Sequence, residues 1–358
     1  MEKRFRANPR YELHAGEQSA EPSEEPVYGY LRPVAPSSSA GRAVSADAAL
    51  LFLTLRQAGP VPGYFRSRLG GRTDTLLLRL VLDGVLEVEH AGGFLSGDPA
   101  RQVLLGDSGY HGDGPLARLS IEAVRYGEAL GELPFPELTR RLYGFGRRPA
   151  TAARKRAAPD PGRDRAARSR YWTPASEDEH WVMWRPLRPQ DTAEQARFKL
   201  YISPDPSRTA EAFEAAADVL GHYAGARGLK LGRGPAGLTR PDKLVAYFSR
   251  LDDLHEAGHA LHRRLAGCPV HGVPFSAELS PDGLLSWGAD RPRSAPGQPA
   301  SWRLWIAARL AAHLGTARTS GVRGALWQFA LDRLRLDGVD TRSWAPTDEF
   351  WLSMAAPT

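Results

Sequence analysis

A stretch rich in Ala, Arg and Pro, residues 147–170, interrupts this chain near its middle. It contains nine basic residues against Asp160 and Asp164, and it shows no apolar periodicity. Such a segment cannot contribute a face to a packed core, so the sequence on either side must bury cores of its own. We interpret residues 147–170 as a basic linker between two folded parts. The alternative is a basic arm that holds an acidic or phosphorylated partner.

The linker also accounts for the net charge of the chain. The 358 residues carry a formal charge of +6 and the linker alone carries +7, which leaves −1 for all remaining residues. The basic character therefore belongs to one segment and not to the folded surfaces. Nucleic acid is not expected as a partner on the ground of charge.

The remaining composition points to a cytoplasmic protein that does not contact membranes. Residues 1–44 are rich in Pro, Ser, Glu and Gly, which predicts a disordered N-terminal tail. Cys268 is the single cysteine, so neither an intramolecular disulfide nor a thiolate metal cluster can form. The start of the chain has no apolar signal region, and its apolar runs are too short to span a bilayer.

Residues 45–146 are interpreted as a winged-helix-like, largely helical module. Segments 48–56, 61–69 and 74–83 have helical apolar spacing, and residues 85–96 alternate and turn like a β-hairpin. Such a module can recognise a peptide by adding a strand to its edge, which is the interpretation preferred here. It can also read DNA, or it can only pack against the rest of the chain.

Residues 171–358 predict an α+β domain with a mixed or antiparallel sheet and covering helices. Short alternating segments at 181–184, 197–202, 229–231 and 243–248 indicate strands, and they are interleaved with helical patterns. No internal repeat is apparent.

Lysine is rare in this chain, and its positions are informative. Only five of the 47 basic residues are lysines, and three of these fall between residues 199 and 243. Lys199 and Tyr201 are two apart on one predicted strand, so both point to the same face. Lys230 lies on a following short strand, and Arg240 and Tyr247 bracket a third.

If these strands are neighbours, their basic and phenolic side chains converge on a surface suited to an anionic substrate. Arginine offers bidentate geometry to phosphate, whereas a lysine beside other cations can have a pKa low enough to accept a proton. The alternative is that the lysines extend along strand edges into solvent.

The strand segments of this domain resemble the Hop A-type effector-like family, whose members occur in actinobacterial gene clusters for class V lanthipeptides and thioamitides. The resemblance covers residues 170–315 and is carried by Arg197–Pro204, Leu229–Leu231, Arg240–Phe248, Gly272–Phe275 and Leu284–Gly288. It implies a lyase that acts after a separate kinase has phosphorylated Ser or Thr of a precursor peptide. Phosphate is eliminated to leave dehydroalanine or dehydrobutyrine. The implied partners are the phosphorylated peptide, the kinase and a cyclase, and no cofactor or metal is implied.

A more remote similarity is to phosphothreonine lyases, and it implies roles for individual residues. Lys199 matches the first lysine of their strand motif, Lys230 the lysine that removes the α-proton, and Arg240 a phosphate-binding arginine. Tyr201 stands where that family has a general-acid histidine, so the identity of the acid departs from the pattern. Further candidates are Tyr247 and His271 as acids, and Arg291 and Arg303 for phosphate.

A competing motif lies in the segment 254–262. His255, Glu256 and His259 form His-Glu-x-x-His, which places two histidines on one helix face as zinc binding requires, and Glu278 follows at the spacing of a third ligand. Against it, Asp253 adds a charge before the first histidine, and no strand run of the expected kind precedes the helix. We interpret the segment as a solvated helix face. A zinc metallopeptidase is the alternative enzyme, and a non-catalytic peptide- or DNA-binding protein is the third hypothesis.

Overall fold

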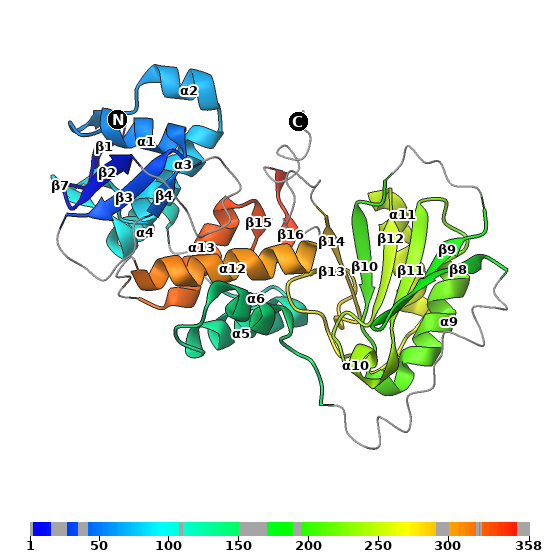
Figure 1. The fold of residues 1–358 in the computed structure, drawn as a ribbon. Helices are drawn as coiled ribbons and strands as arrows, with labels where there is room; N and C mark the ends of the chain where they lie inside the picture. The colour runs from blue at the N-terminus through cyan, green and yellow to red at the C-terminus, as the bar shows by residue number, and fades with distance from the viewer. Residues whose placement is uncertain are drawn as a thin grey trace. The chain divides into compact units, whose positions relative to one another are not determined.

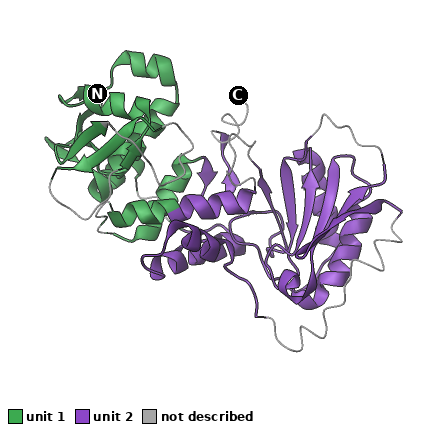
Figure 2. Cartoon of the chain, viewed as in Figure 1, with its two compact units in different colours: residues 1–110, 312–337 green, residues 111–311, 338–358 purple. Residues whose placement is uncertain are grey.

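The computed structural model describes residues 3–15, 27–34, 42–106, 110–149, 170–188, 195–290, 301–319, 322 and 324–348. The chain forms two compact units (Figure 2). Unit 1 contains residues 1–110 and 312–337, and unit 2 contains residues 111–311 and 338–358. Antiparallel sheets combine with helices in both, which confirms the α+β prediction.

Unit 1 has two antiparallel sheets, in the orders β5-β1-β6-β7 and β2-β3-β4. Its strands are β1 (Arg4–Ala7), β2 (Tyr11–Ala15), β3 (Gly29–Pro33), β4 (Arg42–Val44), β5 (Gly59–Pro60), β6 (Leu86–His90) and β7 (Gly93–Leu95). Its helices are α1 (Ala46–Thr54), α2 (Gly63–Leu69), α3 (Arg72–Leu82), α4 (Gly97–Leu105), α13 (Leu326–Leu336) and the second part of α12 (Trp302–Thr319).

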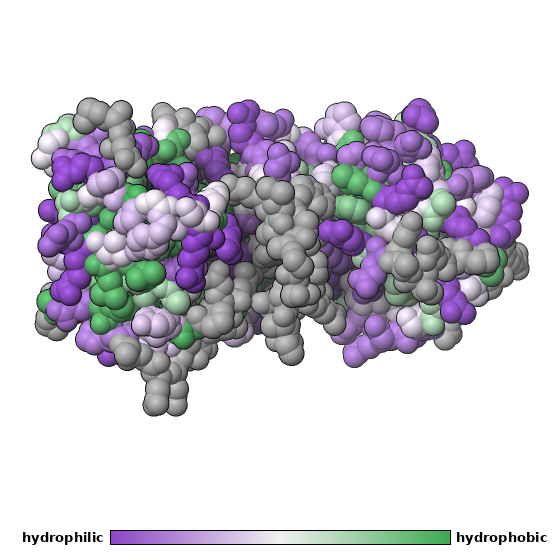
Figure 3. Space-filling view, turned by 90° about the horizontal axis from the view of Figure 1, so that it is seen from above, coloured by the Kyte–Doolittle hydropathy of each residue, from purple (hydrophilic) through white to green (hydrophobic). Residues whose placement is uncertain are grey.

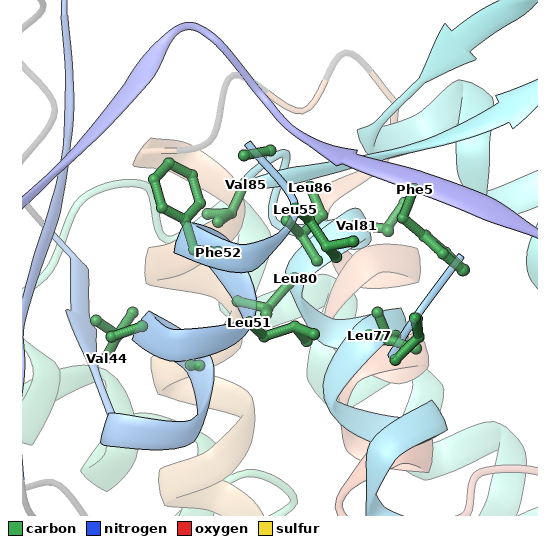
Figure 4. Packing of buried hydrophobic residues seen from close by; sticks show 14 of the residues in the cluster. Phe5, Val44, Leu51, Phe52, Leu55, Leu77, Leu80, Val81, Val85 and Leu86 are labelled. Atoms are coloured by element: carbon green, nitrogen blue, oxygen red, sulfur yellow. The ribbon is translucent and has the colours of Figure 1, made fainter. Parts of the chain in front are cut away.

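Helices α1 to α4 pack their apolar faces into one core (Figure 4), while Ala317 of α12 and Phe329 of α13 form a second cluster with Leu82. Ser45 begins α1, accepting a hydrogen bond from the backbone of Ala48. Leu51, Leu80 and Leu86 from three elements are each at most 5% exposed, and they meet in this core. The helices α1 to α3 and the hairpin β6–β7 follow in the predicted order, and the winged-helix assignment stays a prediction.

The prediction of a disordered tail over residues 1–44 is wrong where the structure describes this segment. Phe5 in β1 is buried in the core of unit 1, and β1 pairs with both β5 and β6. Leu31 in β3 is fully buried. A short strand that pairs on both sides needs few apolar residues to anchor it. The polar composition of residues 1–44 therefore gives no indication of these strands. Residues 16–26 and 35–41 lie outside the described residues.

Unit 2 is built on a seven-stranded antiparallel sheet in the order β13-β14-β10-β12-β11-β9-β8 (Figure 1). The strands of this sheet are β8 (Trp172–Glu177), β9 (Trp181–Pro186), β10 (Phe198–Ile202), β11 (Ala226–Gly232), β12 (Leu244–Phe248), β13 (Ala277–Glu278) and β14 (Leu285–Ala289). A separate two-stranded sheet is formed by β15 (Val339–Asp340) and β16 (Ala345–Pro346). The helices of unit 2 are α5 (Pro115–Ala129), α6 (Phe135–Tyr143), the 3-10 turn η1 (Pro206–Arg208), α9 (Thr209–Leu220), α10 (Gly234–Leu238), α11 (Leu251–Arg264) and the first part of α12.

One face of the large sheet is apolar and is covered by helices. Leu200, Leu229 and Ala246 alternate onto this face and are completely buried. Trp184 of β9 packs on Phe213 of α9 with ring centroids 4.7 Å apart, and α11 contacts β10 and β12. The opposite face carries the alternate residues of the same strands, among them Lys199, Tyr201 and Lys230.

The unit boundaries differ from those predicted at 146 and 171. Helices α5 and α6 belong to unit 2, because the hydroxyl of Tyr143 at the end of α6 donates to Asp242 and its carbonyl accepts from Arg303. Residues 312–337 belong to unit 1, where Arg79 of α3 forms an ion pair with Asp337. Of the predicted linker, residues 150–169 lie outside the described part.

The surface of the molecule is mostly hydrophilic on the face shown in Figure 3, with smaller hydrophobic patches between. Among the described helices, none is both long and apolar enough to cross a bilayer.

Candidate active site

Four predicted site residues share the polar face of the large sheet. Lys199 of β10 pairs with Tyr247 of β12, while Tyr201 and Lys230 flank Val245 of β12 from either side. Directly paired residues of an antiparallel sheet point to the same face, as do residues two apart on one strand. The strands that carry these side chains are therefore neighbours, as their convergence requires.

The surroundings of Lys230 lower the pKa of its amine. The side chain is half-buried, and burial lowers the pKa of its amine from the ordinary value of 10.5. The negative charge of Asp178 opposes this shift, whereas the positive charges of Lys199 and Arg240 lower the pKa further. A lysine with a lowered pKa can accept a proton from a substrate.

Lys199 is held by an acidic partner at the end of the sheet. Its Nζ lies 2.5 Å from Oδ2 of Asp290, and the side chain is nearly buried. Asp290 also accepts a hydrogen bond of 2.8 Å from the backbone of Trp302, where α12 begins. Gly288, which pairs with Lys199, leaves room for this packing because a Cβ there would lie 2.3 Å from the ring of Trp302.

Tyr201 places a hydroxyl in the interior beside this face. The side chain is 2% exposed, and its hydroxyl has no hydrogen-bond partner among the described residues. Burial, and then the charge of Asp290, hold the pKa of Tyr201 well above its usual value of 10.0. The phenol therefore keeps its proton at neutral pH, and a role of Tyr201 as the acid stays a prediction.

Arg240 is fixed by a buried carboxylate and a tyrosine. Its Nε and Nη2 donate to Asp242 at 2.9 and 3.1 Å, and Nη2 also donates to the hydroxyl of Tyr143 at 3.0 Å. Burial alone would raise the pKa of Asp242, but Arg303 and Arg240 together bring it well below its usual range. The carboxylate is thus ionised and holds the guanidinium in one orientation.

Arg303 has a supporting role that differs from the predicted contact with phosphate. It is 1% exposed, its Nη1 lies 2.7 Å from Asp242, and its Nε donates to the carbonyl of Pro274. An arginine enclosed in this way holds Asp242 and does not face a substrate. Arg291, the other predicted phosphate ligand, lies outside the described residues.

His271 is engaged through both ring nitrogens. Its Nε2 lies 2.6 Å from the carbonyl oxygen of Gly146 and must donate to it, so Nδ1 accepts from Nζ of Lys243 at 2.9 Å. Lys243 is completely buried and also donates to the carbonyl of Pro204. The prediction of His271 as a general acid does not fit this arrangement, because its proton is already bound to the backbone.

The structure does not bring together His255, His259 and Glu278, the ligands of the alternative zinc site. Glu278 accepts hydrogen bonds from the backbone of Leu116 at 2.6 Å and of Ala117 at 3.3 Å, so it caps the first turn of α5. His255 on α11 instead contacts the edge of Trp287, with ring centroids 5.5 Å apart. No group of three or more His, Cys, Asp or Glu side chains within the described ranges could hold a metal ion.

Three residues that support the site were missed by reasoning from the sequence: Tyr143, Asp242 and Asp290. Asp242 follows Arg240 by two positions, inside the segment Arg240–Phe248, and no role was predicted for it. Its closeness in sequence to a predicted phosphate ligand was the one signal that could have indicated a role for this carboxylate in the site. The others come from elements distant in sequence, and no local pattern connects them.

No protein-family model matches the chain, and no curated protein matches it in sequence. Among solved structures it is similar to an effector protein from Pseudomonas syringae pv. tomato strain DC3000, with a TM-score of 0.41 and 13% identity over 65% of this chain and 98% of that one. It is similar to the effector and phosphothreonine lyase OspF from Shigella flexneri, with a TM-score of 0.30 and 15% identity over 38% and 77% of the two chains. The Chromobacterium violaceum phosphothreonine lyase effector VirA (SpvC) gives 0.30 and 12% over 53% and 98%.

These solved structures include phosphothreonine lyases, the remote similarity that the strand motifs indicated. The association with lanthipeptide biosynthesis stays a prediction. All three identities lie below 25% and all three TM-scores below 0.5.

Proposed function

We propose that unit 2 is a lyase that eliminates phosphate from phosphoserine or phosphothreonine of a peptide. One observation carries the proposal: a lysine with a lowered pKa, Lys230, shares a sheet face with Lys199 and Tyr201 and lies beside Arg240. Proton abstraction next to a carbonyl needs such a base, and a dianionic leaving group needs fixed cations.

The reaction follows from these positions. The neutral amine of Lys230 takes the proton from Cα, the electron pair of that bond forms the Cα=Cβ double bond, and the Cβ–O bond breaks as phosphate leaves with its electrons. Arg240 binds the phosphate through Nη1, because its Nε and Nη2 already donate to Asp242 and Tyr143. Lys199 stabilises the negative charge that develops on the adjacent carbonyl oxygen, and Tyr201 donates a proton to the leaving phosphate.

The substrate and setting are proposed from the resemblance of the strand motifs. The substrate would be a precursor peptide of lanthipeptide type, phosphorylated by a partner kinase and passed on to a cyclase. The winged-helix-like module predicted over residues 45–146 would recognise this peptide through its part in unit 1, and the reaction would take place in the cytoplasm.

Incubation with a phosphopeptide tests the proposal directly. We expect the peptide to lose the mass of phosphoric acid and to gain a double bond that adds thiols, and the unphosphorylated peptide to stay unchanged. Mass spectrometry before and after thiol addition provides the measurement. A phosphatase would instead give serine or threonine, and a binding module would retain the phosphopeptide without changing it. Either of these results contradicts the proposal.

Tyr201→Phe is expected to separate stability from activity. Removing a buried hydroxyl without a partner should raise the free energy of unfolding by about 1 kcal/mol. If that hydroxyl protonates the leaving group, phosphate release should fall roughly tenfold to a hundredfold, at the lower end of general acid catalysis. Thermal unfolding and phosphate release are measured on the same samples, with Tyr223→Phe on the half-buried turn after α9 as the matched control. A variant that is more stable and fully active would exclude Tyr201 as the acid.

A further inference from the structure

Trp181 lies beneath the two cations to which the proposed reaction assigns base and phosphate binding. The centroid of its ring lies 4.2 Å from Nζ of Lys230 and 4.7 Å from Cζ of Arg240. Both distances are within the range of cation–π attraction, which is strongest for tryptophan. The two cations come from different elements, β11 and the segment after α10, so the indole is the surface that they share.

Two local features of the structure place Trp181 next to Lys230 and Arg240. Oδ1 of Asp178 accepts hydrogen bonds from the backbone of His180 at 2.7 Å and of Trp181 at 2.8 Å, which fixes the turn that leads into β9. Gly232, which pairs with Trp181, allows α10 to approach the sheet, since a Cβ there would lie 2.6 Å from the carbonyl oxygen of Gly237. This approach carries Arg240, two residues after α10, onto the same face.

We propose that Trp181 is a positioning residue that holds the ammonium of Lys230 and the guanidinium of Arg240 against its indole ring. The inference rests on the proposed function, since it concerns the groups that perform the elimination. When Lys230 takes the Cα proton it becomes positively charged, and the ring attracts only this charged form. The indole therefore stabilises the positive charge that develops on Lys230 in the transition state.

The contribution of the Trp181 ring to the pKa of Lys230 can be separated from that of the charged groups around this lysine. Asp178 from the turn before β9 and Asp242 from the loop before β12 raise the pKa of Lys230, while Lys199 of β10 and Arg240 lower it. Replacing Trp181 leaves all four groups in the chain and removes the ring alone. Because the ring favours the ammonium form, we expect Trp181→Leu to lower the pKa of Lys230 by about half a unit.

The pKa of Lys230 can be measured without any enzymatic activity. The chain has only five lysines, so acetylation with a limiting reagent over a series of pH values, followed by mass spectrometry, resolves each of them. Trp181→Phe should shift the pKa of Lys230 less than Trp181→Leu does. Met183→Leu is the matched control, because Met183 pairs directly with Lys230 on the same face and has no ring. An unchanged pKa of Lys230 in Trp181→Leu would overturn the inference, whatever the fate of the proposed function.

Activity provides the second readout. For Trp181→Leu we expect kcat to fall roughly three- to fivefold and the acid limb of the pH profile to move about half a unit lower, with partial rescue in Trp181→Phe. KM for the phosphopeptide should rise as well, because Arg240 loses its support. A loss of rate without movement of the acid limb would show a structural role only, and it would contradict the inference even with the wild type active.

Discussion

Lys230→Arg is expected to reduce phosphate elimination about a thousandfold. General base catalysis contributes roughly 10²- to 10⁴-fold, and a guanidinium cannot deprotonate to take over this task. The substitution keeps a positive charge above Trp181, so the phosphate is still attracted and KM should change much less than kcat. Single-turnover release of phosphate from a phosphopeptide measures the effect.

The base role of Lys230 can be separated from its charge in two further ways. Lys230→Ala should regain part of its activity when a small primary amine is added, whereas Lys230→Arg should not. In the wild type, the acid limb of the kcat/KM profile should lie below pH 10.5, the ordinary pKa of lysine, because burial and neighbouring cations lower the pKa of this amine. Activity should be present above that limb and lost below it. Full activity of Lys230→Arg would refute the assignment.

The sheet face could be predicted from the sequence because strand geometry is periodic. Residues two apart share a face, so Lys199 with Tyr201 needed no tertiary information. The scarcity of lysine among 47 basic residues drew attention to the same strands. What the pattern could not provide was strand order, which places β12 between β10 and β11 and so puts Val245 between Tyr201 and Lys230.

The residues that support the site could not be predicted from the sequence, because their contacts join segments that lie far apart in the chain. Asp242 meets Tyr143, which lies 99 positions earlier, and Arg303, which lies 61 positions later in the chain. The same reasoning explains the error at Arg303: from sequence it is one more arginine, and only burial shows that its charge is used internally. The motif at His255 and His259 has the spacing that zinc binding requires, but Glu278 accepts a hydrogen bond from the backbone at the start of α5.

The short strands of unit 1 were missed for a related reason. β1 is anchored by Phe5, and its stability comes from pairing with β5 and β6, which lie more than 50 residues further along. Composition averaged over residues 1–44 is dominated by the polar segments between the strands, so no window showed the alternation clearly.

Asp242→Asn is expected to lower the free energy of unfolding of unit 2 by about 3–5 kcal/mol. The carboxylate is buried, and it compensates Arg303 as well as Arg240. Removing it leaves the guanidinium of Arg303, which is 1% exposed, without its counter-charge in the interior. Thermal unfolding should show a midpoint lowered by roughly 10 °C. Asp252→Asn, on the exposed first turn of α11, is the matched control and should change little.

The pH dependence of the stability distinguishes loss of the Asp242 charge from a change in side-chain packing. Because the pKa of Asp242 is depressed in the folded state, its contribution to stability is fully present above about pH 4, the value for an unfolded aspartate, and it is lost as the pH falls further. The wild type and Asp242→Asn should therefore converge in stability on acidification, measured by denaturant unfolding at a series of pH values. The double variant Asp242→Asn with Arg303→Met should recover part of the loss, since removing both buried charges costs less than leaving one unpaired. A difference between wild type and Asp242→Asn that is small at neutral pH, or that does not shrink on acidification, would show that the carboxylate does not hold the two arginines in place.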